Sequence, residues 1–184
     1  MTELLLAEPA TDPTVGLAAA GDHAAFTRLV ATHHAAMARV AFAITGDPDT
    51  AADAVQVAWA TAWRRLPSLR DHGSVRAWLI AIAANEARQL NRRRTSRAIV
   101  DLSDDLGDVL LAPSGSDPSG RIEAVDLSRV LARLGPDDRA LLALRFVAGM
   151  DSLQIARHLG LSASGVRSRL ARLLERLRKE LDRE

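Results

Sequence analysis

The sequence predicts an all-α protein made of two small helical domains joined by a flexible acidic linker. Alanine and leucine, which favour helices, dominate a hydrophobic content of 48%, whereas the 184 residues include only three Trp, three Phe and no Tyr. Apolar residues recur at three- and four-residue spacing in two stretches, separated by a stretch rich in Ser, Gly, Pro and Asp. We therefore expect a poorly ordered tail over 1–20, domains over 21–97 and 127–184, and a linker over 98–126.

Three helices joined by short turns are expected in the first domain. One begins after the N-cap Asp22 and ends at Gly46, and a second covers about 50–66 before Pro67. A third starts near residue 74 and continues into a run of arginines. Three helices of this length can share one small core.

The most specific local motif lies in the second domain and is typical of a helix-turn-helix. A short helix should end at Gly160, which suits a left-handed C′ position, and Ser162 should cap the next helix. The apolar stripe of that helix comprises Val166, Leu170, Leu173, Leu177 and Leu181. Its opposite face carries short polar and basic side chains suited to a major groove, namely Ser164, Arg167, Ser168, Ala171 and Arg172.

Charge is segregated along the chain although the net charge is only +1. The balance is −5 over 1–60, +7 over 61–97, −6 over 98–128, +1 over 129–151 and +4 over 152–184. Two basic blocks separated by an acidic one indicate a two-site polyanion binder.

The first basic block contains an arginine run on one predicted helix. Cations at a helix C-terminus complement its dipole by well under about 1 kcal/mol each, which explains one or two of them. Phosphate binding explains the whole run, which comprises Arg76, Arg88, Arg92, Arg93 and Arg94.

Several classes of protein are excluded by what the sequence lacks. It has no cysteine for disulfides or thiolate metal sites, and no apolar run reaches the roughly 20 residues needed to cross a membrane. Its five histidines are scattered, and no phosphate-cradling glycine loop or nucleophile triad is recognisable. We expect a cytoplasmic protein without membrane insertion, metal or cofactor that is not an enzyme.

Two segments of the first domain carry a family resemblance that the helix-turn-helix completes. Residues 53–64 (DAVQVAWATAWR) and 76–85 (RAWLIAIAAN) resemble successive helices of extracytoplasmic-function (ECF) sigma factors, subunits of bacterial RNA polymerase. Residues 161–170 are similar to the recognition helix of the same family. The resemblance implies a sigma region 2-like bundle, a region 4-like domain and an alternative sigma factor that recognises minus-ten and minus-thirty-five promoter elements.

The resemblance also implies partners and site residues. Core RNA polymerase would be bound through its clamp helices and flap, with Asp53, Gln56, Arg64 and Arg65 on the clamp. Asn85 would contact a flipped minus-ten base beside the 66–74 loop, and the arginine run would hold the surrounding phosphates. The minus-thirty-five element would meet Ser164, Arg167, Ser168, Arg169 and Arg172. An anti-sigma factor is a further expected partner. The linker would tether the domains, follow the RNA-exit path, or do both.

Three positions depart from the family pattern. Val57 stands where an acid is usual and Thr61 where a base is common, both on the predicted polymerase-binding helix. Gly165 replaces a usual threonine and costs a helix about 1 kcal/mol relative to alanine. It either permits close approach to the DNA backbone or is simply tolerated.

Two other functions compete with a sigma factor. A conventional DNA-binding regulator, usually dimeric, would explain residues 127–184 but gives no task to the motifs between Asp53 and Asn85. A scaffold protein without DNA binding leaves both arginine blocks unexplained, and an enzyme is the weakest alternative.

Overall fold

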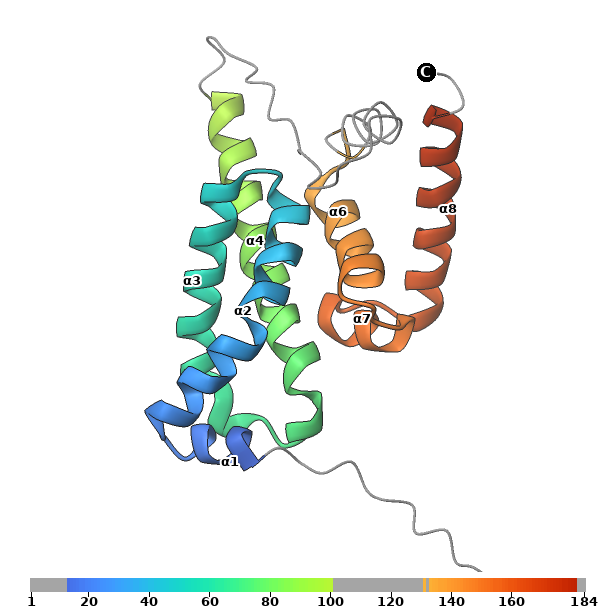
Figure 1. Ribbon diagram of the computed structural model, residues 1–184. Coiled ribbons are helices and arrows are strands. Elements are labelled where there is room, and N and C mark those ends of the chain that lie inside the picture. Colours follow the sequence, from blue (N-terminus) through green and yellow to red (C-terminus); the bar gives the residue numbers. More distant parts are fainter. Residues whose placement is uncertain (1–12, 101–130, 132, 182–184) are drawn as a thin grey trace, which may run out of the picture.

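The computed structural model describes residues 13–100, 131 and 133–181, and within them every regular element is helical. Figure 1 shows a bundle of α1 to α4 on one side and a smaller group of α6, α7 and α8 on the other. The helices of the bundle are α1 (Pro13–Ala19), α2 (His23–Thr45), α3 (Pro48–Arg65) and α4 (Val75–Val100), with the 3₁₀ turns η1 (Leu66–Ser68) and η2 (His72–Ser74) between the last two. The second group comprises α6 (Pro136–Leu142), the π-helical η3 (Ala143–Val147), α7 (Ser152–Leu159) and α8 (Ala163–Leu181).

The ends of the first long helices follow from local chemistry, as predicted. The Asp22 carboxylate accepts a hydrogen bond from the Ala25 N–H at 2.9 Å, and Gly46 ends α2 with a φ of 70°. Asp47 then caps α3, which has Pro48 in its first turn. Two helices thus meet in a turn of two residues.

The expected tail and the first domain boundary need correction. Residues 13–19 form α1, and its Val15 and Ala18 side chains are buried in the bundle core. These small apolar residues stabilise a short helix once a partner helix covers them. The backbone of α4 also continues to Val100, three residues beyond the predicted boundary at 97. Residues 1–12 and the predicted linker from 101 onward lie outside the described residues.

The helix α6 begins at Pro136 and leads into one feature that the sequence did not indicate. The helix of α6 widens into the π turn η3, where the Ala148 N–H bonds to the Ala143 carbonyl at 2.9 Å. Leu144 is fully buried there, whereas the Phe146 side chain is 62% exposed. The wide turn therefore separates a buried face from an exposed aromatic.

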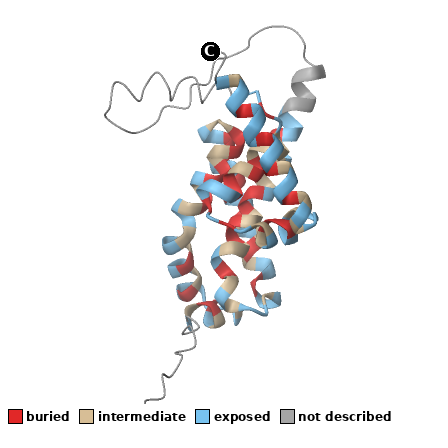
Figure 2. Cartoon of the chain, turned by 90° about the vertical axis from the view of Figure 1, so that its right-hand side faces the viewer, coloured by how far each residue is buried: buried red, intermediate tan, exposed pale blue. Residues whose placement is uncertain are grey.

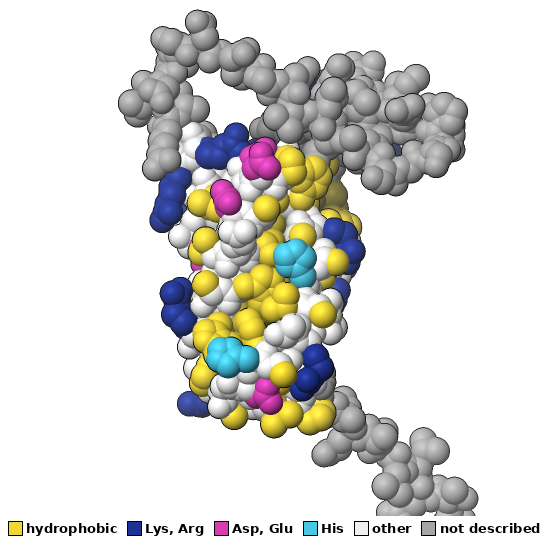
Figure 3. All heavy atoms as spheres, turned by 60° about the vertical axis from the view of Figure 1, so that its left-hand side comes forward, with side chains coloured by type: hydrophobic (Ala, Val, Ile, Leu, Met, Phe, Trp, Pro, Cys, Tyr) yellow, Lys and Arg dark blue, Asp and Glu magenta, His cyan; other side chains and the backbone are white. Residues whose placement is uncertain are grey.

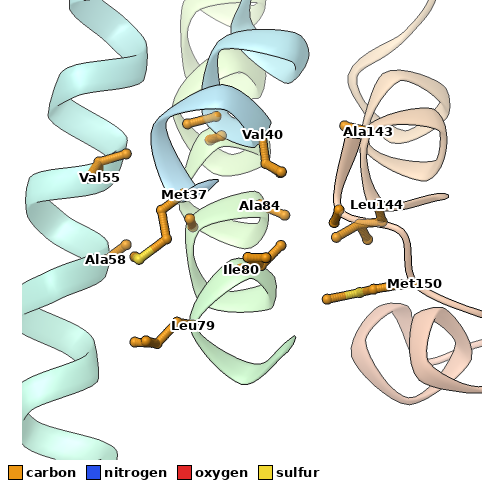
Figure 4. Close-up of a cluster of buried hydrophobic side chains, with 14 of the residues drawn as sticks. Met37, Val40, Val55, Ala58, Leu79, Ile80, Ala84, Ala143, Leu144 and Met150 are labelled. Carbon is orange, nitrogen blue, oxygen red and sulfur yellow. The ribbon is translucent and has the colours of Figure 1, made fainter. Parts of the chain in front are cut away.

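One apolar core continues from the bundle into the second group of helices. Figure 4 shows Val40 of α2 and Ile80 of α4 facing Leu144 and Met150 across the space between the two groups. All four side chains are at most 3% exposed. Seen from the side in Figure 2, buried residues extend through both groups. The two domains are therefore packed against each other in this structure.

Candidate nucleic-acid interface

The helix-turn-helix is held by caps at both of its helices. Asp151 accepts hydrogen bonds from the N–H groups of Leu153 and Gln154 at 2.8 Å, and the Gln154 side chain accepts from the Asp151 N–H at 2.9 Å. Gly160 ends α7 with a φ of 67°, and the Ser162 hydroxyl accepts from the Gly165 N–H at 3.0 Å. The glycine and serine predicted to make the turn therefore have those roles.

Replacing Asp151 with alanine should lower the stability of the helix-turn-helix, because two backbone N–H groups lose their acceptor. The expected loss is about 0.5–2 kcal/mol. Urea denaturation followed by far-UV circular dichroism would measure it. Asp53→Ala is the control, because Asp53 is exposed in the interior of α3 and lies outside its first turn. Equal midpoints for the two variants would contradict the capping role.

The inward face of α8 is close to the prediction. Val166, Leu170, Leu173 and Leu177 are buried, but Leu181 is 39% exposed. The prediction that Leu181 faces inward is wrong, because α8 extends past its last buried contacts with Leu134 and Leu142. The stripe therefore covers about three turns of the helix.

The outward face of α8 presents most of the predicted minus-thirty-five residues to solvent. Ser164, Arg167, Ser168 and Arg172 are exposed. Arg169 is instead partly buried and paired within the chain. Its guanidinium lies 2.8 Å from a carboxylate oxygen of Asp138 on α6, and the same carboxylate pairs with Arg176 at 3.1 Å. Arg169 thus connects α8 to α6, with its side chain 38% exposed.

Gly165 has a structural reason that the sequence did not show. A Cβ atom at this position would lie 3.0 Å from the Ser162 hydroxyl oxygen, which is the atom that caps the helix. A side chain would crowd that cap. Glycine therefore lowers the intrinsic stability of the helix but leaves space for the capping hydroxyl at the N-terminus of α8.

A hollow of about 420 Å³ beside α4 brings together candidates for two different roles. Its walls include Asn85 and Trp78 of α4 and the arginines Arg64 and Arg65 at the end of α3. Asn85 is exposed on this wall, as a base-contacting amide needs to be. The minus-ten and polymerase-binding candidates therefore meet at one edge of the bundle.

The sequence did not single out His158, which also lines this hollow. His158 belongs to α7, so a residue of the helix-turn-helix lies at the candidate minus-ten surface. Partial burial, with a smaller contribution from the charge of Arg157, lowers the pKa of His158. The imidazole is therefore neutral at neutral pH.

Most of the predicted minus-ten arginines have partners within the chain. Arg88 and Arg92 both bind the Asp137 carboxylate, at 2.7 and 2.6 Å. Arg76 donates to the Ala148 carbonyl at 3.3 Å, and Arg94 binds Asp47 and Thr50 at the α2–α3 turn. Arg93 is exposed. The run is therefore together on α4, but its guanidinium groups point to several different partners.

Asp137 and Asp138 are the residues of this surface that the sequence did not reveal. Burial acts to raise the pKa of the Asp137 carboxyl, but hydrogen bonds and charges from Arg88 and Arg92 outweigh it and leave the pKa below its ordinary value. The carboxylate is therefore fully charged at neutral pH. Its partners lie 45 and 49 residues earlier in the chain, so no local sequence pattern connects them.

The predicted polymerase face lies along α3. Asp53, Gln56, Arg64 and Arg65 are exposed, and Val57 is 44% exposed. Beside them, Ala38 and Phe42 of α2 and Ala51 and Val55 of α3 line an apolar groove. Figure 3 shows this side of the molecule, with hydrophobic side chains along its middle and basic ones at its edges. Such an apolar centre with a polar rim is typical of protein interfaces.

The two tryptophans of α3 are half-buried between the core and this face. Phe26 contacts both edge-on, with ring centroids 5.5 Å from Trp59 and 4.8 Å from Trp63. His23 stacks on Trp63 at 4.7 Å. Their main contacts are therefore with α2.

No helix of the described residues is long and apolar enough to cross a membrane. The same part of the chain contains no group of three or more His, Asp or Glu side chains placed to hold a metal ion.

Comparison with known proteins accounts for both domains. The family descriptions "Sigma-70 region 2" and "Sigma-70, region 4" match residues 29–97 and 124–177. The sigma factor CnrH of Cupriavidus metallidurans is 33% identical over 90% of this chain and 91% of its own length. The ECF sigma factor SigL of Mycobacterium tuberculosis is 32% identical over 89% of this chain and 93% of its own.

Two further comparisons bear on length and fold. The probable sigma factor RfaY of Xanthomonas campestris is 33% identical over 89% of this chain, which spans only 42% of RfaY. The solved structure of CnrH in complex with the cytosolic domain of CnrY superposes with a TM-score of 0.65 and 28% identity, over 94% of this chain and 97% of CnrH. The chain therefore belongs to the ECF family of sigma-70-type sigma factors, alternative sigma factors that direct promoter-specific transcription.

Proposed function

We propose that the two domains divide promoter recognition, with the α1–α4 bundle capturing minus-ten bases and α8 reading the minus-thirty-five duplex. The hollow beside α4 is the observation that carries the proposal, because the exposed amide of Asn85 lines it beside Trp78. An amide can bind a base edge through paired hydrogen bonds, and arginines of the same helix, such as the exposed Arg93, can hold the phosphates of an unpaired strand.

The second half of the proposal rests on α8. Its first turns expose Ser164, Arg167 and Ser168 while the opposite face is buried in the domain. A helix-turn-helix presents the start of its second helix to the major groove in this way. Arg172 is placed for phosphate contact, and Arg169 supports α8 through Asp138.

We assign the exposed side of α3 to core RNA polymerase. The apolar groove between α2 and α3 would supply affinity, and Asp53, Gln56, Arg64 and Arg65 would fix the register on the clamp. Val57 adds apolar area where an acid is usual, so this contact should depend less on salt than in other family members. Catalysis of RNA synthesis would belong to the polymerase alone, and the chain would act in the cytoplasm beside it.

A partner protein that restrains the sigma factor is part of the same proposal. The structure of CnrH was solved with the cytosolic domain of CnrY. A partner of this kind, acting as an anti-sigma factor, would compete with polymerase for the present chain.

Run-off transcription would test the proposed function directly. The full chain, purified without partners, would be mixed with core RNA polymerase and promoter-bearing genomic fragments. We expect tight polymerase binding and new transcripts that start at defined positions, both absent when the chain is omitted. If binding and specific initiation both fail, the proposal is wrong.

A further inference from the structure

The Asp137 carboxylate lies on the boundary between the two domains, where it holds two arginines of the other domain. Asp137 stands in the first turn of α6, while Arg88 and Arg92 project from α4. The carboxylate accepts from Arg88 at 2.7 and 2.9 Å and from Arg92 at 2.6 and 2.7 Å. Arg88 is only 18% exposed in this contact. Charge-assisted hydrogen bonds of this kind are roughly twice as strong as neutral ones.

Further contacts hold the domains together around this ion pair. Arg76 donates to the Ala148 carbonyl at 3.3 Å, and Leu144 and Met150 pack against Ile80 (Figure 4). His158 lines the hollow that contains Asn85. The contacts of Arg76 and His158 place residues of the helix-turn-helix domain over part of the candidate minus-ten surface, and the apolar contact beneath them holds the domains together.

The packed arrangement is incompatible with simultaneous use of both promoter elements. Their positions differ by about 25 base pairs, which corresponds to about 85 Å of duplex at 3.4 Å per step. Domains in direct contact cannot span that distance. The 30 residues 101–130 can reach at most about 100 Å when fully extended, which is sufficient once the domains separate.

An acid in the first turn of a helix has an ordinary explanation, because it complements the helix dipole by about 0.3–1 kcal/mol. That explanation applies equally to Asp137 and Asp138, which lie side by side in α6. Asp138, however, binds Arg169 and Arg176 of its own domain, whereas Asp137 forms its ion pairs with Arg88 and Arg92 of the other domain. The dipole does not account for this difference.

We propose that Asp137 is an autoinhibitory latch, which closes the two domains on each other and occupies Arg88 and Arg92 in place of promoter phosphates. The inhibitory part rests on the proposed minus-ten role of these arginines. Asp137 thus mimics a phosphate within the chain, and promoter binding requires the latch to open.

The distance between the domains would test the latch without using DNA. The chain has no cysteine, so cysteines introduced at Ala60 and Arg178, both exposed, would carry the only labels in the full-length protein. Asp137→Asn keeps the shape of the side chain but removes its charge, and it should lower the closed-to-open ratio by roughly tenfold. Spin-label distance measurements would then show longer distances than in the unaltered chain.

Two more variants serve as a control and as an independent test in the distance measurement. Asp49→Asn removes the same charge from an exposed position on α3 and should leave the distances unchanged. Arg92→Gln acts from the other side of the ion pair, at a side chain that is 53% exposed, and should also lengthen them. If Asp137→Asn and Arg92→Gln both give the distances of Asp49→Asn, the latch does not exist.

Binding of a short single-stranded oligodeoxynucleotide would test the inhibition. Freeing two arginines for phosphates should steepen the dependence of log affinity on log salt by about 1.4 in Asp137→Asn, and Asp49→Asn should not change it. Longer distances with a steeper slope support the whole proposal. Longer distances with an unchanged slope overturn the inhibition and place the failure in the minus-ten role of Arg88 and Arg92, while the latch itself stands.

Discussion

Replacing Leu79 with alanine should lower the free energy of unfolding of the α1–α4 bundle by about 2–5 kcal/mol. Leu79 is 1% exposed and lies on α4, the helix that packs against both α2 and α3. In Figure 4 its side chain extends toward α3 below Met37 and Ala58. Because Leu79 is fully buried among packed helices, truncation should leave a cavity.

The three tryptophans make this measurement specific to one domain. Trp59, Trp63 and Trp78 all lie in the bundle, so their fluorescence during urea denaturation reports its unfolding. Leu17→Ala is the matched control, because Leu17 belongs to the same domain and is 49% exposed. A loss below about 1 kcal/mol for Leu79→Ala, or an equal loss for Leu17→Ala, would contradict the packing described above.

The second large effect concerns the division of labour between the domains. Arg167→Ala should weaken binding of the minus-thirty-five duplex by about 1–3 kcal/mol, because it removes an exposed basic side chain from the start of α8. Asn85→Ala should leave that step intact and reduce open-complex formation, because the lost amide contacts a base only after the strands part. Both residues are exposed, so neither change should unfold the chain.

Separate assays for the two steps would reveal the difference. Holoenzyme binding to an upstream duplex measures the first step, and permanganate reactivity of unpaired thymines measures the second. Arg178→Ala, which removes an exposed arginine two turns farther along α8 from the candidate readers, should behave as the unaltered chain in both assays. Identical defects for Asn85→Ala and Arg167→Ala would contradict the divided roles.

Local chemistry was sufficient to predict most of the elements. Asp22, Gly46, Gly160 and Ser162 mark helix ends through bonds to their immediate neighbours, and such signals can be recognised in a sequence. The all-helical fold and the sigma family followed from composition and from two motif-bearing helices. The helix α1 was not predicted because its few apolar residues stabilise it only when α2 covers them.

Contacts distant in sequence could not be predicted in the same way. The arginine run was correctly placed on one helix, but nothing in the sequence pairs Arg88 with Asp137 or Arg94 with Asp47. The assignment of individual residues to DNA and polymerase stays a prediction, since it concerns partners outside the chain. The structural role of Gly165 could not be predicted either, although the contact is short in sequence. It depends on the position of the Ser162 hydroxyl group three residues earlier.

The π turn over Ala143–Val147 has a consequence for how the family can change in evolution. A π turn accommodates one residue more than the α-helical hydrogen-bonding pattern, and an α-helix turns by about 100° per residue. Deleting one residue here would restore an ordinary helix and turn everything after it by that angle. Insertions and deletions in this segment should therefore turn the recognition helix about the α6 axis, and they would require its contacts with α6, such as the Arg169–Asp138 ion pair, to form anew.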